Sequence, residues 1–456
     1  MKRSSFLVIA TMFLFVLSAA PISQADEFTS DSIKNIAKRC AKYRLSRGVN
    51  NLTDAYGTNQ LNWDIGAYMT GIMALYRLTG EQWVLDSATK WSNNASWTPG
   101  GGINATGDAQ CCEQTFLTIY LLSNDTANRI EMAKPSLDNM KQMFDVNRST
   151  GRARWWWSDA LYMSPPLVAR LYPVYKTIDS ADADRLLDSM SEYWQDCAAY
   201  LYNSQYKLWW RDGSFISSTA ANGSPVFWSG CNAWVIAGLA HVLQDMPSGY
   251  NNRAYYVQQF KDMCNALRQV PALGTDGLWR TSLLDYAQFP NKESIASAFF
   301  GFAFAWGINN GLLDATTYTP LVRATWSALV ANIGSDGRLQ WCQTINSQPD
   351  NVQQNFSAPE GEGAFCLMAE ELTKMLFPTS IRPTMQHQLS SHNHGINRMI
   401  LISGDGKTAG RSPNAASAVL YNLRGKIAGS TAGSGTIVPP AGFYAVKNGG
   451  NTANVK

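Results

Sequence analysis

The sequence is poor in charged residues and in histidine, and these shortages exclude several classes of protein. Charged residues make up 16% of the chain and the formal net charge is only +3, so no basic surplus points to a nucleic-acid partner. The 456 residues include four histidines and no Cys-x-x-Cys pair. The sequence therefore gives no support for a zinc site or a redox motif.

Long apolar runs are also scarce. The one clear run, at residues 6–17, follows Lys2 and Arg3 and precedes the small residues Ser23 and Ala25, which is the pattern of a secretory signal peptide. The run is too short to cross a bilayer comfortably, and no other segment is long enough. We therefore expect residues 1–25 to be a cleaved signal peptide. The mature protein should be exported (secreted, periplasmic or at the cell surface) and should have no membrane span.

Eight cysteines are scattered along the chain, most of them in apolar contexts of helical period. An oxidising compartment permits disulfides, but the spacing does not determine a pairing. We expect mostly buried thiols with one or two bridges.

What the chain does have is a repeated helical pattern. Six segments are small and apolar nearly all round, as expected of helices that are buried on both sides. Between them lie six amphipathic segments with charges on one face. The apolar segments are residues 63–80, 113–124, 159–175, 232–245, 293–313 and 361–377, and the amphipathic ones are 31–47, 82–94, 129–145, 180–202, 252–270 and 317–333. Alternation of inner and outer helices predicts an all-α (α/α)6 barrel over residues 26–378.

After residue 378 the composition changes. Residues 379–395 are polar and are predicted to be a linker. Residues 396–456 contain short β-type runs at 398–403, 418–423 and 442–447, separated by glycine-rich turns, and are predicted to form a small β-rich module. The module resembles the C-terminal sorting domain of type IX bacterial secretion. A β-rich appendage without a sorting role is the alternative.

The most informative motif is Arg-Trp-Trp-Trp-Ser-Asp-Ala-Leu-Tyr-Met-Ser-Pro-Pro at residues 154–166. Three tryptophans directly precede Asp159. Burial among indole rings disfavours the charged form of a carboxyl, whereas a helix N-terminus favours it by typically about 0.3–1 kcal/mol, much less than full burial can contribute. A dry pocket should therefore raise the pKa of Asp159, as a general acid requires. The alternatives are a tryptophan core and an Asp that caps a helix.

This motif closely resembles the signature of the unsaturated rhamnogalacturonyl hydrolases and unsaturated glucuronyl hydrolases (glycoside hydrolase families 105 and 88). Those enzymes carry Trp-Trp-Cys/Ser-Asp-Ala-Leu-Phe/Tyr-Met-Ala/Ser-Pro. Further segments match the family in the same order, and the resemblance extends over about residues 30–378. The matching segments are 207–212, 226–234, 276–280, 293–294 and 361–365. The resemblance implies the same (α/α)6 barrel.

The resemblance also implies a reaction. The substrate would be an oligosaccharide with a 4,5-unsaturated uronic acid at its non-reducing end, left by a polysaccharide lyase and here expected to come from rhamnogalacturonan or another pectin. An acid protonates C4, water adds at C5, and the resulting hemiketal opens and releases the sugar. This chemistry needs no cofactor and no metal. The oligomeric state stays open.

Residue roles follow from the matched positions. Asp159 corresponds to the family's catalytic Asp, which donates the proton and activates water. Asp108 corresponds to a second active-site Asp that contacts the sugar hydroxyls, although it can also be a helix cap. Arg211 falls in a substrate-contacting loop and can bind a uronate carboxylate, unless Asp212 holds it in a surface salt bridge. The remaining predicted substrate-binding residues are Trp157, Met163, Trp228, Asn232 and Trp234, and core packing is the alternative for each tryptophan.

One departure from the family leaves other functions open. Relatives carry a substrate-binding Arg where this chain has Gly230. A guanidinium–carboxylate hydrogen bond is typically worth about 1.5–3 kcal/mol, so its loss points to a different substrate or to a different cation. The alternatives are another (α/α)6-barrel sugar enzyme, such as an inverting glycosidase or a lyase, and a non-catalytic carbohydrate-binding barrel. The only histidine of the barrel, His241, lies within a predicted helix, which argues against a histidine-based lyase.

Overall fold

The computed structural model describes residues 26–49, 52, 61–100, 102, 107–122 and 129–378, together with the backbone of four strands between residues 417 and 455. The predicted signal peptide and the predicted linker lie outside the described residues. Among the helices that are described, none combines the length and the apolar character that crossing a bilayer requires.

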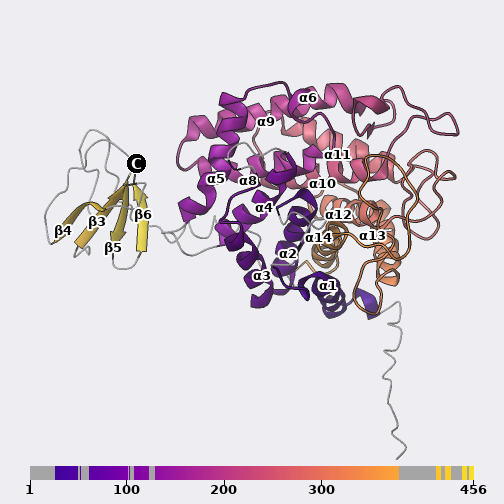
Figure 1. Ribbon diagram of the computed structural model, residues 1–456, viewed down its shortest axis with the longest axis horizontal. Helices are drawn as coiled ribbons and strands as arrows, with labels where there is room; N and C mark the ends of the chain where they lie inside the picture. Colours follow the sequence, from indigo (N-terminus) through magenta and orange to yellow (C-terminus); the bar gives the residue numbers. More distant parts are fainter. Residues whose placement is uncertain are drawn as a thin grey trace, which may run out of the picture.

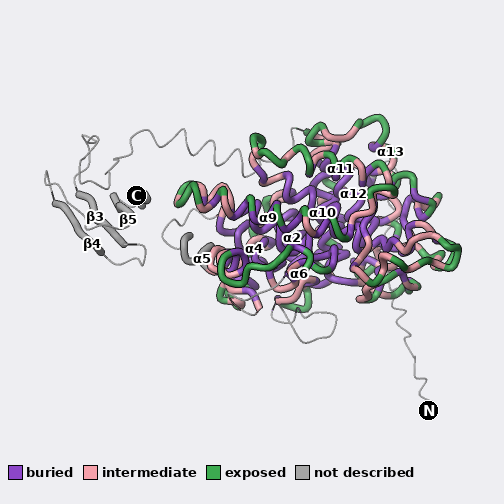
Figure 2. Tube along the Cα trace, turned by 90° about the horizontal axis from the view of Figure 1, so that it is seen from above, coloured by how far each residue is buried: buried purple, intermediate pink, exposed green. Residues whose placement is uncertain are grey.

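Six inner helical segments form a closed ring, in which each contacts the next and the last returns to the first (Figure 1). In ring order they are α2 (Trp63–Thr79), α4 (Gly107–Leu122), α7 (Ala160–Met163) with α8 (Pro165–Tyr175), α10 (Ser229–Asp245), α12 (Ser294–Asn309) and α14 (Pro359–Leu376). These segments are apolar nearly all round, and Figure 2 shows buried chain along α2, α4 and α10. A helix without a polar face needs neighbours on every side, which the ring and its outer layer supply.

An outer layer surrounds the ring; its first helix precedes the first inner helix in the chain, and each of the other five joins two inner ones. These helices are α1 (Ser30–Leu45), α3 (Gln82–Asn94), α5 (Arg129–Lys141), α9 (Ser180–Leu201), α11 (Arg253–Leu267) and α13 (Ala315–Ala331). Several begin at side-chain caps; for example, Asp179 accepts a hydrogen bond from the Asp182 N–H at the start of α9. The alternation confirms the predicted (α/α)6 barrel.

The short elements lie between these helices. They are η1 (Asp26–Phe28), the π-helical turn η4 (Gln142–Val146), α6 (Gly151–Arg154), the paired strands β1 (Tyr202–Asn203) and β2 (Leu208–Trp209), and η5 (Gly213–Phe215).

Two helix boundaries differ from the sequence prediction. The second inner helix begins at Gly107 rather than near residue 113, so Asp108 lies in its first turn and not in the preceding loop. The third inner helix, predicted as one piece, is divided at Ser164 into α7 and α8. Two prolines, Pro165 and Pro166, start α8, because proline fits the first turn of a helix but lacks the N–H needed further inside.

The expected disulfides are absent. All eight cysteines lie in the described part of the chain, and every one is a buried free thiol. The prediction of buried thiols was therefore right, and the prediction of one or two bridges was wrong.

Buried ion pairs occupy the inner helices toward their C-terminal ends. Arg77 near the end of α2 pairs with Glu370 of α14 at 2.7 Å, and Arg170 of α8 pairs with Asp245 at the end of α10 at 2.9 Å. His241 lies in the same region, fully surrounded by protein, and burial together with Arg170 and Arg77 lowers its pKa well below the ordinary value. His241 is thus a neutral core residue.

The four C-terminal strands form one antiparallel sheet of order β4-β3-β5-β6, with β3 (Ser417–Asn422), β4 (Ile427–Ala432), β5 (Tyr444–Asn448) and β6 (Asn451–Val455). Strands β3 and β5 coincide with two of the predicted runs. The third predicted run, at 398–403, lies outside the described residues. Strands β4 and β6 were not predicted because their sequences are rich in small or polar residues.

The ring depends on close backbone contact between α2 and α14, which we expect a single methyl group to disrupt. A Cβ added at Gly363 would lie 2.6 Å from the Ala67 carbonyl oxygen, and a Cβ added at Gly71 would lie 2.3 Å from the Gly363 oxygen. Overpacking of this kind costs about 1–3 kcal/mol, which exceeds the helix-propensity gain of at most about 1 kcal/mol. Gly363→Ala should therefore lower the free energy of unfolding measured by urea denaturation.

The matched control is Gly249→Ala, where nothing lies within 4 Å of the added Cβ. This variant should stay within about 0.5 kcal/mol of the parent protein. Equal denaturation midpoints for the two variants would contradict the close packing of α2 on α14.

Candidate active site

A cavity of about 370 Å³ opens where the inner helices begin. Every inner helical segment contributes a residue from its N-terminal end or from the residue just before it. The cavity is lined by Trp63, Asp108, Trp156, Trp157, Asp159, Met163, Arg211, Trp228, Gly230, Trp234, Glu293, Ile295, Gln343, Thr344, Ile345, Asn346 and Glu360. The structure therefore brings together all the predicted site residues except Asn232.

Asp159 stands at the entrance to α7 but does not cap it. Its side chain makes no capping hydrogen bond, the residue is 8% exposed, and its Oδ2 atom has no hydrogen-bond partner. The main chain before it is held by an isolated β-bridge between Trp157 and Asp212 and by the Ser158 N–H, which donates to the Arg211 carbonyl at 2.7 Å. The alternative of a helix cap is thus excluded, and the carboxyl faces the cavity.

The surroundings of Asp159 favour its protonated form. Burial raises the pKa of Asp159 to about 7, the Arg211 guanidinium lowers it, and the Asp108 and Asp212 carboxylates raise it. Burial also raises the pKa of Asp108, against the opposing effect of Arg211. The expected competition is therefore decided by desolvation, which outweighs both the cation and the helix N-terminus.

Arg211 takes part in both of the arrangements considered from the sequence. Its Nη1 atom binds Asp212 Oδ2 at 2.9 Å, while its Nε atom lies 3.7 Å from Asp159 Oδ2 and makes no hydrogen bond. The guanidinium lies over the Trp156 ring, with its carbon 5.2 Å from the ring centre. One edge of the guanidinium is thus held by protein and the other borders the cavity.

The tryptophans divide between core and cavity. Trp155 is fully buried and packs edge-on against Tyr193. Trp156 is 49% exposed at the rim, and its ring centre is 4.9 Å from that of Trp157. Trp234 packs edge-on against Trp63 at 5.6 Å, and both line the cavity. The walls are therefore indoles, which suit the faces of sugar rings.

Trp228 explains why residue 230 is glycine. A Cβ added at Gly230 would lie 2.3 Å from Cζ2 of the Trp228 indole. The indole is fixed there because its Nε1–H donates to Gln343 Oε1 at 2.8 Å. The tryptophan therefore occupies the space that an arginine side chain at position 230 would need.

Asn232 holds the backbone instead of lining the cavity. Its side-chain amide donates to the Trp228 carbonyl at 2.8 Å and to the Trp209 carbonyl at 3.0 Å, and its Oδ1 accepts from the Trp209 N–H at 2.8 Å. The amide thus joins β2 to the first turn of α10. The residue positions Trp228, and the predicted substrate contact at Asn232 is not part of the cavity.

Two carboxyls of the cavity received no role from the sequence. Glu293 caps α12, accepts from the N–H groups of Ile295 and Ala296, and also accepts from that of Gln343 at 3.2 Å. Burial still raises its pKa to about 7. Glu360, in the first turn of α14, is 3% exposed, and its Oε2 atom has no partner.

The sequence held a signal that could have placed Glu360 at the cavity, but it held none for the loop at residues 343–346. Pro359 followed by Glu360 is typical of a helix start, and the inner helices start at the mouth. Residues 343–346 carry no periodicity and no motif, so only the structure could place them there. Among the described residues, no group of His, Cys, Asp and Glu is placed to hold a metal ion.

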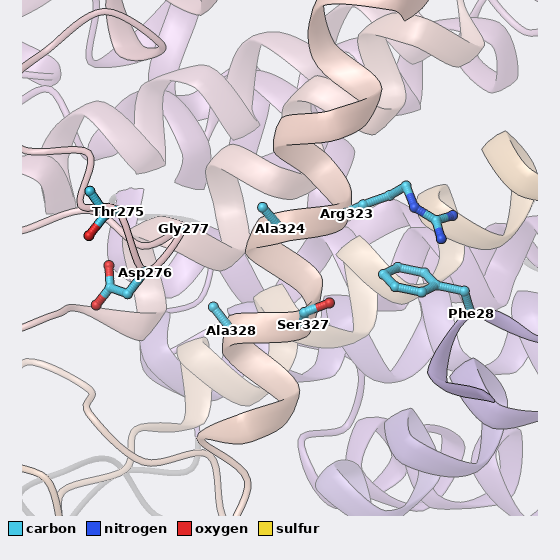
Figure 3. A pocket seen from close by; sticks show the side chains of 8 residues that line it. All are labelled: Phe28, Thr275, Asp276, Gly277, Arg323, Ala324, Ser327 and Ala328. Carbon is cyan, nitrogen blue, oxygen red and sulfur yellow. The ribbon is translucent and has the colours of Figure 1, made fainter. Parts of the chain in front are cut away.

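A second, wider hollow of about 630 Å³ lies between η1, the turn at residues 275–277 and α13 (Figure 3). Asp276 is its one carboxylate, and an ion pair of 2.7 Å ties it to Arg280. Arg323 lies over the Phe28 ring. The carboxylate of this hollow is thus held in a direct ion pair, whereas the Oδ2 atom of Asp159 has no hydrogen-bond partner.

Known proteins with similar sequences belong to the family that the motifs resemble. The profile of the family described as Glycosyl Hydrolase Family 88 matches residues 33–376. An unsaturated 3S-rhamnoglycuronyl hydrolase of Formosa agariphila is 32% identical over 330 residues, which are 69% of this chain and 85% of the relative.

Solved structures are similar in fold. A family 88 glycosyl hydrolase from Bacteroides vulgatus has a TM-score of 0.66 and 26% identity, and the match covers 76% of this chain and 99% of that one. A protein named as a polysaccharide lyase has a TM-score of 0.67 and 27% identity, over 78% of this chain and 99% of that one.

The raised pKa of Asp159 should be visible in stability. The folded state keeps the Asp159 proton up to about pH 7, whereas the unfolded chain loses it near the ordinary value of 3.8. Wild-type stability therefore falls by up to about 1.4 kcal/mol per pH unit across this window because of this group. Asn cannot ionise, so the unfolding free energy of Asp159→Asn minus that of wild type should rise from pH 4 to 7 and then level off.

The control is Asp314→Asn at the exposed cap of α13, where hydrogen bonds from Thr317 lower the pKa of the carboxyl. The unfolding free energy of Asp314→Asn should differ from that of wild type by a constant amount above pH 5, and this difference should shrink only as the pH falls below about 4. Denaturant titrations at half-unit intervals of pH separate the two patterns. A constant difference for Asp159→Asn would show that this carboxyl is ionised in the folded protein.

Proposed function

Because the chain belongs to glycoside hydrolase family 88, it is a glycoside hydrolase, and we propose that it removes 4,5-unsaturated uronic acid from the non-reducing end of lyase-generated oligosaccharides. The observation that carries the proposal is Asp159: a nearly buried carboxyl with one unpartnered oxygen, in a cavity walled by indoles. A pKa of about 7 lets this group both give and take a proton at neutral pH.

The proposed reaction needs one such group. Asp159 donates its proton to C4 of the double bond, and positive charge develops at C5 and the ring oxygen. The Asp159 carboxylate then accepts a proton from the water that adds to C5. The resulting hemiketal opens and releases the neighbouring sugar, and Asp159 is protonated again. No bond at C1 is displaced directly, so the carboxylate-separation rule of ordinary glycosidases does not apply.

Arg211 is placed to hold the substrate carboxylate. The carboxylate of an unsaturated uronate is attached to C5, next to the atom that is protonated, so a cation for it must lie close to the acid. The Arg211 Nε atom lies 3.7 Å from Asp159 Oδ2 and has no hydrogen-bond partner. The guanidinium can therefore serve in place of the arginine that relatives carry at position 230.

Asp108 is the second catalytic candidate. It lies in the first turn of α4, lines the same cavity and raises the pKa of Asp159 through its charge. Its proposed role is to bind the ring hydroxyls of the uronyl residue. In this place it keeps the sugar aligned and helps Asp159 to retain its proton.

The neighbouring sugar is proposed to be rhamnose. The Formosa agariphila relative is named for a 3S-rhamnoglycuronyl substrate. Rhamnogalacturonan, the pectic source expected from the sequence, presents rhamnose next to the uronic acid as well. We also propose that the protein acts outside the cytoplasm, on the basis of the signal-peptide pattern at residues 1–25.

A polysaccharide lyase is the second candidate, because the structure named as such a lyase is about as similar as the family 88 hydrolase. A lyase would need a base to remove the C5 proton. The described residues that line the cavity include no His and no Tyr, and the carboxyls there have raised pKa values or a cation beside them. The two reactions change ultraviolet absorbance in opposite directions, since hydrolysis removes the unsaturated uronate and elimination creates it.

The first activity test uses Asp159→Asn on unsaturated disaccharides from rhamnogalacturonan lyase digestion. Wild type should bleach the ultraviolet band, and the variant should be slower by about 10²–10⁴-fold, the usual contribution of a positioned acid. The wild-type kcat/KM should be flat at acidic pH and fall as the pH rises through about 7, because the required form of Asp159 is protonated.

Asp276→Asn, in the outer hollow of Figure 3, is the matched control and should keep the wild-type rate. An increase in absorbance with intact polysaccharide would support the lyase instead. Binding without any absorbance change, for every unsaturated disaccharide tried, would identify a non-catalytic carbohydrate-binding barrel.

The second test concerns Arg211. Arg211→Met should raise KM by roughly 10- to 100-fold, because a hydrogen bond to a charged group is worth about 1.5–3 kcal/mol. It should also move the alkaline limb of the pH–rate profile upward, since the guanidinium lowers the pKa of Asp159. Steady-state kinetics from pH 5 to 9 measure both effects. The control is Arg152→Met, because Arg152 is an exposed arginine that pairs with Asp196. If Arg211→Met had the same kinetics as Arg152→Met, Arg211 would have no role in substrate binding.

A further inference from the structure

The polar groups that line the cavity form two sets of different chemistry, one around Asp159 and one around Glu360, which are called its two ends. The charges that act most strongly on Asp159 are those of Arg211, Asp108 and Asp212. Those that act most strongly on Glu360 are Asp64, Arg44 and Glu293. The Trp228 indole and the Gln343 side chain that holds it also line the cavity. The end with Arg211 is charged, and the end with Glu293 and Glu360 consists of buried carboxyls next to amides.

Glu360 is the unusual residue of the second end. It is 3% exposed, it lines the cavity, and its Oε2 atom has no hydrogen-bond partner. The arginine that acts on it, Arg44, is already engaged by Glu362, with Nε–Oε2 and Nη2–Oε1 distances of 2.7 and 3.1 Å. A buried polar atom without a partner is costly, so an atom of this kind in a residue that lines a cavity can take a hydrogen bond from a ligand or a water that enters the cavity.

The protonation of this end fits a neutral ligand. Burial and the Asp64 carboxylate raise the pKa of Glu360 well above its ordinary value, and burial raises that of Glu293 to about 7. A protonated carboxyl both donates and accepts a hydrogen bond, as a sugar hydroxyl does. Gln343 and Asn346 add amide groups of the same kind to the lining.

Among the described residues, no cation without a carboxylate partner lies next to Glu293 and Glu360 in the cavity lining. Arg211 is the single Lys, Arg or His among the described residues that line the cavity. A sulfate or carboxylate placed here would lose its hydration opposite two carboxyls and gain no counter-charge.

We propose that Glu360 and Glu293 bind the hydroxyl groups of the sugar that follows the unsaturated uronyl residue, and that they select against a sulfate or carboxylate on that sugar. This selectivity rests on the proposed function. Glu360 is the specificity-determining residue, because it offers the unpartnered oxygen, while Glu293 is held in place by the N-terminus of α12 and by the Gln343 N–H.

The test compares three unsaturated substrates: a uronyl–rhamnose disaccharide, the same disaccharide with a sulfate on O3 of rhamnose, and a uronyl methyl glycoside without the second sugar. Wild type should have a kcat/KM at least tenfold higher for the neutral disaccharide than for the sulfated one. Glu360→Met should raise KM for the neutral disaccharide about tenfold with kcat little changed. The methyl glycoside should not distinguish the variant from wild type.

Glu360→Gln provides the conservative rescue. An amide keeps the size of the protonated carboxyl and its ability to donate and accept, so this variant should recover most of the wild-type KM. The melting temperature of Glu360→Met should equal or exceed that of wild type, because this variant removes a buried acid that has an unsatisfied oxygen. Glu360→Gln keeps both polar atoms and should melt close to the wild-type temperature.

The outcomes separate the two proposals. If wild type bleaches none of the three substrates, the proposed function fails. If it bleaches the methyl glycoside but hydrolyses sulfated and neutral disaccharides equally well, the function stands and the selectivity is wrong. The selectivity is also wrong if Glu360→Met changes the kinetics of the methyl glycoside as much as those of the disaccharide.

Discussion

The structure depends on one competition between burial and charge at the mouth of the barrel. The inner helices begin around the same cavity, and helix N-termini favour anions. The acids placed there are nevertheless pushed toward their neutral forms, because the indole walls and the close packing exclude water. Glu293 shows which effect is stronger: three backbone N–H groups donate to it, and its pKa is still raised to about 7. The same balance leaves Asp159 with a transferable proton.

The sequence predicted the barrel and the centre of the site but not all of its boundaries. Helical period and apolar character were sufficient for the six helix pairs. The start of α4 was missed because Gly107 and the residues after it are small or polar and do not look apolar. The break before Pro165 was missed because the apolar pattern continues across it. In both places a local feature decided the boundary within a longer periodic segment.

The role of a residue could be predicted where a sequence motif identified its functional group, but not where the role depends on the direction in which the side chain points. Asp159 and Arg211 line the cavity as their motifs implied. Asn232 shares a motif with Trp228 but points its amide at the backbone. The absence of an arginine at position 230 was visible in the sequence, whereas its cause, an indole folded over Gly230, was not. The helix-start pattern at Pro359 could have placed Glu360 at the mouth, but its unpartnered oxygen could be found only in the structure, because it leaves no mark on composition or spacing.

The eight free thiols carry a consequence for biogenesis. If the chain is exported, it meets oxidants while still unfolded, and disulfides can form and reshuffle within seconds to hours. Each thiol must therefore be enclosed before it is oxidised, or the chain will be trapped in a cross-linked form. The closed ring encloses all eight thiols, so the folded protein should tolerate a reducing cytoplasm as well as an oxidising exterior. Production in ordinary bacterial cytoplasm, without folding oxidases, is accordingly compatible with its architecture.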